Sequence, residues 1–247
     1  RQLGLRVGRI VIDAGHGGHD PGAMGMGTTE AAITLDIALR LEHLLANEPD
    51  IEVVLTRRTD QFVPLQERTA IANREAADLY VSIHANANRD KTARGVETYL
   101  LNFASNADTA AVAARENASS TLTMSHLSDL VRQIALSSKG KESRDLAGQL
   151  QNSLVRRLRV SNRHVRDLGV KQAPFVVLVG AAMPSVLVEV AFLTHAQEGR
   201  LLAGQAYRQR IAESLLDGIR RYLRSLKKTP IVANRELPPP AVTRRDR

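Results

Sequence analysis

The feature that most constrains this chain of 247 residues is the alternation of short β-branched segments with segments of helical periodicity. A strand is expected at 9–13, where Ile-Val-Ile precedes a glycine-rich loop. Apolar residues recur with helical spacing from Ile33 onward, and Pro49 lies beyond the end of that helix. The same patterns predict strands at 51–55, 78–84, 95–101, 175–178 and 185–190, and helices after Pro64, over 146–158 and over 207–226. The alternation predicts a single α/β domain with a mostly parallel or mixed twisted sheet of about six strands, flanked by helices.

One segment, 104–143, interrupts this alternation. It is rich in Ala, Ser, Asn and Thr and contains two weak helical patterns, near 109–118 and 127–136. It is too long for an ordinary connection, so we expect a helical insertion within a domain that spans residues 1–228. Residues 229–247 contain several prolines and basic residues and are expected to form a flexible tail.

The charge of the chain is concentrated at one end. Residues 220–247 carry nine Lys or Arg and two acidic residues, which accounts for +7 of the net charge of +8. The rest of the chain is nearly neutral, and it has no Trp and only 3% aromatic residues. Both facts argue against a nucleic-acid-binding protein. The absence of Cys excludes disulfides and thiolate ligands. No apolar stretch of about 18 residues predicts a transmembrane segment, and no segment has the pattern of a signal peptide.

Two histidines follow predicted strands. His16 lies in a glycine-rich loop directly after the first strand, and His84 ends the strand at 78–84. The carboxyl ends of parallel strands meet at one edge of a sheet, so the two side chains can converge. Glu30 stands near the start of the first helix. In a chain without Cys, zinc needs His and carboxylate ligands. His16, Glu30 and His84 are therefore candidate ligands of one catalytic zinc ion.

A fourth candidate, Glu189, lies in an otherwise apolar strand. A buried carboxylate is costly unless it is paired or used, and a salt-bridged core residue is the alternative interpretation. Burial would raise the pKa of such a carboxyl group, and next to a zinc-bound water it could act as a general base. From the residues alone, the chemistry is hydrolysis of an amide or an ester.

Four motifs occur in order between Arg9 and Leu226: DAGHGGHDPGA, the glutamate that follows it, SIHAN and PSVLVEVAFLTH. Together they closely resemble the zinc-dependent N-acetylmuramoyl-L-alanine amidases of bacterial cell-wall remodelling. The resemblance implies that His16, Glu30 and His84 bind zinc and that Glu189 is catalytic. It implies peptidoglycan as the substrate, cut at the amide between N-acetylmuramic acid and L-alanine. A cell-wall substrate in turn implies a periplasmic or extracellular location.

The resemblance also suggests a role for the 104–143 insertion. Some cell-division amidases carry an insertion here that folds over the zinc and blocks it. We therefore expect autoinhibition, with Glu116 as the blocking carboxylate and Asp129 and Glu142 as weaker candidates. An activator protein at the division site would contact the insertion and pull it away.

Three further side chains have expected roles, two at the site and one in supporting a loop. His19 is close enough in sequence to touch substrate, Asn86 could orient His84, and Arg68 is expected to support a loop. Two alternatives to the amidase remain open, namely a zinc peptidase that acts on other peptides and a cell-wall-binding module without catalytic activity.

Overall fold

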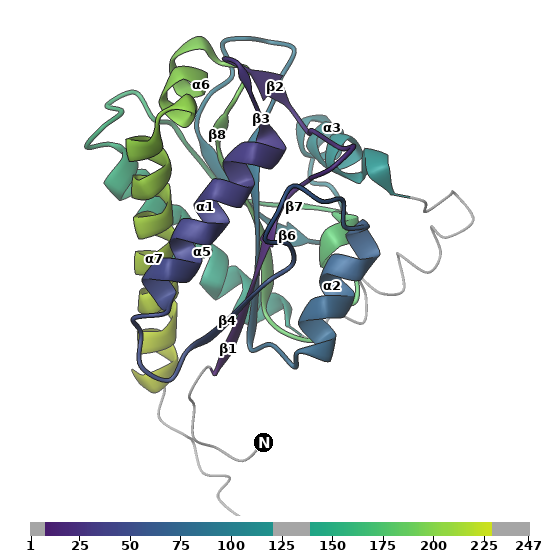
Figure 1. Ribbon diagram of the computed structural model, residues 1–247, viewed down its shortest axis with the longest axis vertical. Coiled ribbons are helices and arrows are strands. Elements are labelled where there is room, and N and C mark those ends of the chain that lie inside the picture. The colour runs from purple at the N-terminus through teal and green to yellow at the C-terminus, as the bar shows by residue number, and fades with distance from the viewer. Residues whose placement is uncertain (1–7, 121–138, 229–247) are drawn as a thin grey trace, which may run out of the picture.

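A six-stranded sheet runs through the molecule between two layers of helices (Figure 1) in the computed structural model, which describes residues 8–120 and 139–228. Its strand order is β4-β1-β5-β8-β6-β7. The first four of these strands are parallel, β6 is antiparallel to β8, and β7 is parallel to β6. The strands are β1 (Arg9–Ala14), β4 (Glu52–Leu55), β5 (Leu79–Asn86), β6 (Val96–Leu101), β7 (Asp167–Ala173) and β8 (Ser185–Phe192). The mixed α/β sheet that the sequence predicted is confirmed.

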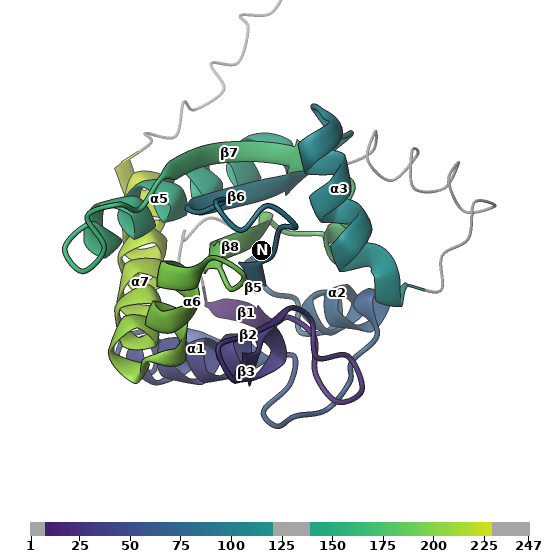
Figure 2. The same ribbon diagram turned by 90° about the horizontal axis from the view of Figure 1, so that it is seen from above.

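Both faces of the sheet are covered, which explains the β-branched character of its central strands. Ile10 and Ile12 of β1 join the apolar core beneath one helical layer, and Val11 between them joins the core of the other. The first layer consists of α1 (Glu30–Leu45), α5 (Gly140–Leu158) and α7 (Gln205–Lys228). The second consists of α2 (Leu65–Arg74), α3 (Ala107–Glu116) and the 3₁₀ turn η3 (Val176–Leu178), and the view from above separates the layers (Figure 2).

The prediction of a strand at 175–178 is wrong. Val176–Leu178 form the 3₁₀ turn η3, and their side chains fill the core on the α2 side. The sixth strand is instead β7, whose sequence DLGVKQA carries Gly and charged residues. It lies at the edge of the sheet and is largely accessible to solvent, so it shows no buried β pattern. The sequence also did not predict helix α6 (Ala196–Ala203) or the small hairpin of β2 (Met24–Gly25) and β3 (Thr28–Thr29).

The described part of segment 104–143 contains α3, the 3₁₀ turn η1 (Asn117–Ser119) and the first turn of α5. The pattern at 127–136, with Asp129, lies outside the described residues, and so does the tail at 229–247. Among the helices described, none combines the length and apolarity needed to cross a membrane.

Candidate metal centre

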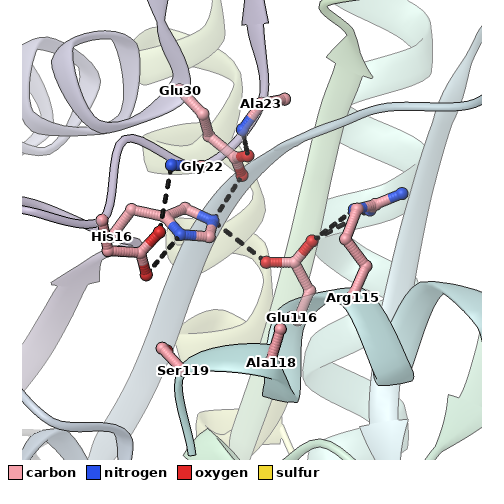
Figure 3. A pocket seen from close by; sticks show the side chains of 9 residues that line it. His16, Gly22, Ala23, Glu30, Arg115, Glu116, Ala118 and Ser119 are labelled. Carbon is pink, nitrogen blue, oxygen red and sulfur yellow. Dashed lines mark hydrogen bonds and ion pairs between the residues drawn. The ribbon is translucent and has the colours of Figure 1, made fainter.

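Four buried side chains from four separate segments converge at the carboxyl ends of the central strands. His16 follows β1, Glu30 opens α1, His84 lies near the end of β5, and Glu116 is the last residue of α3. One donor atom from each lies within 4.8 Å of the other three. His16 Nε2 is 3.2 Å from Glu30 Oε1 and 3.0 Å from Glu116 Oε2 (Figure 3). His84 Nδ1 is 3.1 Å from Glu30 Oε1 and 2.8 Å from Glu116 Oε2.

Glycines allow these side chains to approach one another. A Cβ atom on Gly15 would lie 2.5 Å from the His84 ring, and one on Gly22 would lie 2.6 Å from the His16 ring. His16 itself has a φ of 60°, a left-handed conformation that costs free energy in a residue with a Cβ atom. The glycines of the sequence motif therefore make room for the two imidazoles, and the surrounding structure must hold His16 in its strained turn.

Two buried arginines hold that turn, and we call them the carbonyl clamp. Arg57 donates from Nε to the carbonyl oxygen of Ala14 and from Nη2 to that of Gly15. Arg68 donates from Nη1 to Ala14 O and from Nη2 to His16 O. Both arginine side chains are 1% exposed. Three consecutive carbonyl oxygens are thus held by the two guanidinium groups, which agrees with the structural role expected for Arg68.

The charge of Arg68 is balanced by Asp13, whose carboxylate lies 2.9 Å from Arg68 Nη1. Burial alone would raise the pKa of Asp13, but the ion pair with Arg68 and hydrogen bonds donated by Ser82 and Thr56 outweigh it and lower the pKa. Arg57 has no carboxylate in contact among the described residues; burial and the neighbouring Arg68 lower its pKa to about 10.

Glu30 is held by backbone amides. The helix α1 begins at Glu30, three residues earlier than the sequence predicted, because Thr29 caps it by accepting from Ala32 N. Glu30 Oε2 accepts a hydrogen bond from Ala23 N, and Oε1 accepts one from Ala85 N, both at 2.9 Å. The second bond ties this carboxylate directly to the strand that carries His84.

Asp20 is a site residue that the sequence reasoning missed. Its Oδ2 lies 3.0 Å from His16 Nδ1, and its Oδ1 accepts from Gly22 N. A carboxylate on the far nitrogen of a histidine fixes the ring and leaves Nε2 directed at the metal position. The sequence did carry a signal, because Asp20 lies four residues after His16 in the same glycine-rich loop.

Glu189 lies on β8 beside His84 of β5 and is fully buried. Neither of its carboxylate oxygens accepts a hydrogen bond from the described part of the chain. The only cation within 4.0 Å among those residues is Arg115, whose Nη2 is 3.5 Å from Oε1. Burial and the nearby carboxylate of Glu116 raise its pKa well above the ordinary value for a glutamate. An unsatisfied carboxyl group of this kind is suited to accept a proton.

Helix α3 is attached to the rest of the domain on both sides of Glu116. Arg115 donates to Ala87 O and to Asn86 Oδ1, and it also contacts Glu116 Oε1 at 2.9 Å. Asn117 donates from Nδ2 to Pro174 O and accepts at Oδ1 from Val176 N. These two residues, which we call the α3 anchors, place the carboxylate of Glu116 against both imidazoles.

The remaining candidates do not contribute donor atoms to the cluster. Asn86 is buried, but its side chain bonds to Arg115 and Glu97, and no hydrogen bond joins it to His84. His19 is exposed, and its ring packs on Phe62 with the centroids 4.1 Å apart. Glu142 lies on the first turn of α5, where it forms an exposed ion pair with Lys139. It therefore does not reach the cluster of donor atoms.

The donor set fits a zinc ion. A tetrahedral zinc with bonds of about 2.0–2.1 Å separates its ligand atoms by about 3.3 Å, close to the distances of 2.8–3.2 Å between imidazole nitrogens and carboxylate oxygens here. The charges agree. Burial disfavours protonation of His84, but Glu116 and Glu30 overcome it and raise its pKa to about 10. Two buried carboxylates thus demand positive charge, which a divalent cation would supply with both imidazoles neutral.

The cavity beside this cluster has a volume of about 200 Å³. His16, Glu30 and Glu116 line it, together with Arg115, Ala118 and Ser119 from the α3 side. Pockets that enclose a whole ligand are usually larger, about 300–1,000 Å³. With α3 in this position, only a small chemical group could reach the metal position.

The fold and the site define an α/β protein with a buried His/Glu donor set suited to a divalent cation. A family model described as N-acetylmuramoyl-L-alanine amidase (Amidase_3) matches residues 10–221. The chain belongs to this family.

Individual members of the family are similar over most of the chain. AmiC of Escherichia coli O6:H1 is 35% identical over 226 residues, which cover 86% of this chain and 52% of that protein. The chain thus spans about half the length of that relative. The crystal structure of an amidase from Clostridium difficile 630 covers 88% of this chain and 97% of its own, with 30% identity and a TM-score of 0.68. The CwlD amidase from Clostridioides difficile, solved in complex with the GerS lipoprotein, covers 88% of this chain and 98% of its own, with 26% identity and a TM-score of 0.66.

Proposed function

We propose that this chain is a zinc-dependent amidase that cleaves the bond between N-acetylmuramic acid and the L-alanine of the peptidoglycan stem peptide. The observation that carries the proposal is the convergence of His16, Glu30 and His84 next to Glu189, a buried glutamate to which no described residue donates a hydrogen bond. Family membership supplies the substrate class. A cell-wall substrate places the working enzyme in the periplasm or outside the cell.

Each site residue has a chemical task in this proposal. His16, Glu30 and His84 hold the metal, and Asp20 and the carbonyl clamp keep His16 in place. When bound, zinc supplies a Lewis acid that polarises the scissile carbonyl and lowers the pKa of water. Glu189 takes the proton of the attacking water and passes it to the departing nitrogen of L-alanine. Its raised pKa lets it hold that proton between the two transfers.

We further propose that the chain is autoinhibited in the arrangement described. A catalytic zinc keeps one coordination position for water or substrate, and the carboxylate of Glu116 is the fourth donor in this cluster. Helix α3 also narrows the cavity to about 200 Å³. A partner protein that binds segment 104–143 would draw α3 away and open the site for septal cell-wall splitting. The structure of the similar CwlD amidase in complex with the GerS lipoprotein supports a protein partner of this kind.

The proposed activity is tested on purified peptidoglycan with the zinc-loaded chain. We expect release of intact stem peptides that begin with L-alanine, identified by mass spectrometry. The substitution Glu189→Gln should reduce the rate about 10²–10⁴-fold and leave zinc content unchanged. Cleavage within the stem peptide would instead indicate a zinc peptidase. A Glu189→Gln variant as active as the parent chain would rule out the assigned base.

The alternative of a non-catalytic cell-wall-binding module predicts a different result. Such a module would bind peptidoglycan equally well with and without Glu189→Gln and would release no peptides in either form. The parent chain and the Glu189→Gln variant, both assayed by polymer sedimentation and by product release, therefore distinguish the two functions.

A further inference from the structure

Arg115 covers two hydrogen-bond acceptors at the end of β5 that belong to the sheet and not to α3. Its Nη1 donates to the carbonyl oxygen of Ala87, and its Nη2 donates to Asn86 Oδ1 at 3.0 Å. The same Nη2 is 3.5 Å from Glu189 Oε1. Asn86 and Ala87 follow His84 by two and three residues. One guanidinium group thus meets three acceptors beside the metal cluster, and Figure 3 shows it next to Glu116.

The orientation of the Asn86 amide is determined by its hydrogen bond to Glu97. Asn86 Nδ2 donates to Glu97 Oε1 at 2.6 Å, and Tyr99 OH donates to the same oxygen. Glu97 Oε2 accepts from Lys171 Nζ. An ionised carboxylate only accepts hydrogen bonds, so the amide nitrogen of Asn86 must face Glu97 and its oxygen must face Arg115. Asn86 and Glu97 are both buried, so the Asn86 amide has little freedom to rotate.

Removal of α3 would leave Asn86 Oδ1 and Ala87 O without their donor. A buried acceptor without a donor costs free energy, so these two oxygens would accept hydrogen bonds from water or from a ligand instead. Next to the bond that an amidase cleaves, the substrate itself carries peptide N–H groups. Arg115 therefore offers the site the same kind of hydrogen-bond donors that a peptide would.

We propose that Asn86 Oδ1 and Ala87 O form an acceptor pair that binds N–H groups of the stem peptide, and that Arg115 occupies this pair as a substrate mimic while α3 is in place. This inference rests on the proposed function, because it identifies the ligand from the reaction. It assigns to α3 two blocking contacts, Glu116 at the metal position and Arg115 at the peptide-binding position. Asn86 is then a substrate-binding residue, and Glu97 is a positioning residue that acts through it.

The test uses the full chain with Arg115→Ala and Glu116→Ala, so that neither blocking side chain is present. Asn86→Leu is added to this background, and KM and kcat are measured on soluble peptidoglycan fragments. Binding of muramyl dipeptide, which carries peptide N–H groups but no ammonium group, is measured by calorimetry in forms that also carry Glu189→Gln. We expect Asn86→Leu to weaken binding about three- to tenfold, the effect of one lost hydrogen bond, mainly through KM. Zinc content should not change.

Matched variants separate binding from folding. Glu97→Gln conserves volume but lets the new amide donate to Asn86 Oδ1, so the Asn86 amide can turn round and present Nδ2 to the substrate. We expect the same weakening as for Asn86→Leu. Lys171→Met removes the ion-pair partner of Glu97, but Asn86 Nδ2 and Tyr99 OH still donate to the carboxylate, so the Asn86 amide keeps its orientation. Binding should stay within about twofold of the background, even though the free energy of unfolding falls because the buried Glu97 has lost its cation.

The results distinguish this inference from the function on which it rests. Equal binding and equal KM with Asn86→Leu and Glu97→Gln would overturn the acceptor pair while the amidase activity stands. Loss of zinc in Glu97→Gln, or a loss of binding in Lys171→Met as large as in Glu97→Gln, would likewise overturn it in favour of a structural role. If the background chain releases no stem peptides, the proposed function fails, and the calorimetric comparison still decides whether the pair binds a peptide.

Discussion

The turn after β1 and the end of α3 each bring one side chain to the metal cluster, but the domain holds them in different ways. His16 is held by the carbonyl clamp, whose two arginines are 1% exposed and lie between the sheet and its loops. Glu116 is held by the α3 anchors, and the Arg115 side chain is 33% exposed. The first attachment can be lost only if the core is disrupted. The second can be lost while the sheet remains intact, because its partners are strand ends and loop backbone.

Under the proposed autoinhibition, this difference separates a permanent metal ligand, His16, from a removable one, Glu116. Elements with few buried contacts open at lower free energy than core elements, and moving parts of proteins are drawn from them. In this proposal the cluster of four donors combines three side chains attached to the core, His16, Glu30 and His84, with one, Glu116, that a partner could displace.

The largest expected effect is the loss of stability when an arginine of the carbonyl clamp is replaced. Arg68→Met leaves the buried carboxylate of Asp13 without its ion-pair partner, and breaking such a pair by removing one member costs about 3–5 kcal/mol. The free energy of unfolding, measured by denaturant titration, should fall by that amount. Arg58→Met is the matched control, because Arg58 pairs with Glu42 at the surface and should cost at most about 1 kcal/mol. Similar losses in both variants would show that the clamp is not a core element.

The next effect concerns the removable ligand. Glu116→Ala should raise basal peptidoglycan hydrolysis about 10- to 1,000-fold, if the open form of the parent chain is populated at about 0.1–10%. Its unfolding free energy should change far less than that of Arg68→Met. Glu142→Ala, in the same segment but exposed and remote from the cluster, should leave hydrolysis unchanged. Equal rates for Glu116→Ala and the parent would remove autoinhibition from the proposal.

A smaller effect is expected at the second anchor. Asn117→Ala removes the bonds to Pro174 O and Val176 N, worth about 1–2 kcal/mol of α3 attachment. Basal hydrolysis should rise about 5- to 30-fold, with faster hydrogen exchange at the Val176 amide. Asn47→Ala, at an exposed position just beyond the end of α1, is the control. Activation without any change in exchange at Val176 would contradict the anchoring role.

The smallest expected effect is the pH dependence of the stability that Asp13 contributes. The folded-state pKa of Asp13 is lowered, so its stabilising contribution is present above the unfolded pKa of about 3.9 and is lost as the pH falls through the folded value. The difference in unfolding free energy between the parent and Asp13→Asn should therefore stay constant from pH 7 to pH 5 and shrink only below about pH 4. If burial, and not Arg68, dominated at Asp13, the folded-state pKa would be raised, and the parent would gain stability relative to Asp13→Asn as the pH falls from 7 to 5.

Much of the metal centre could be inferred from local sequence. His16 and His84 follow β-branched segments, and the ends of parallel strands meet at one edge of a sheet. The prediction erred where the local pattern was ambiguous. The segment at 175–178 is apolar because it fills the core as a 3₁₀ turn, whereas the true edge strand β7 is polar because solvent reaches it.

The sequence by itself determined the α/β class, the two histidines at strand ends and the glycines between them, because each depends on residues close together in the chain. The family resemblance predicted Glu116 as the carboxylate over the metal, and in the tertiary structure it meets His16 across 100 residues of sequence. Only the tertiary structure decided that Arg57 and Arg68 hold the carbonyl oxygens around His16, and that Glu97 turns the Asn86 amide toward α3. These contacts join side chains from different layers of the fold. Their geometry depends on how α3 and the buried arginines pack on the sheet, and no local periodicity specifies that packing.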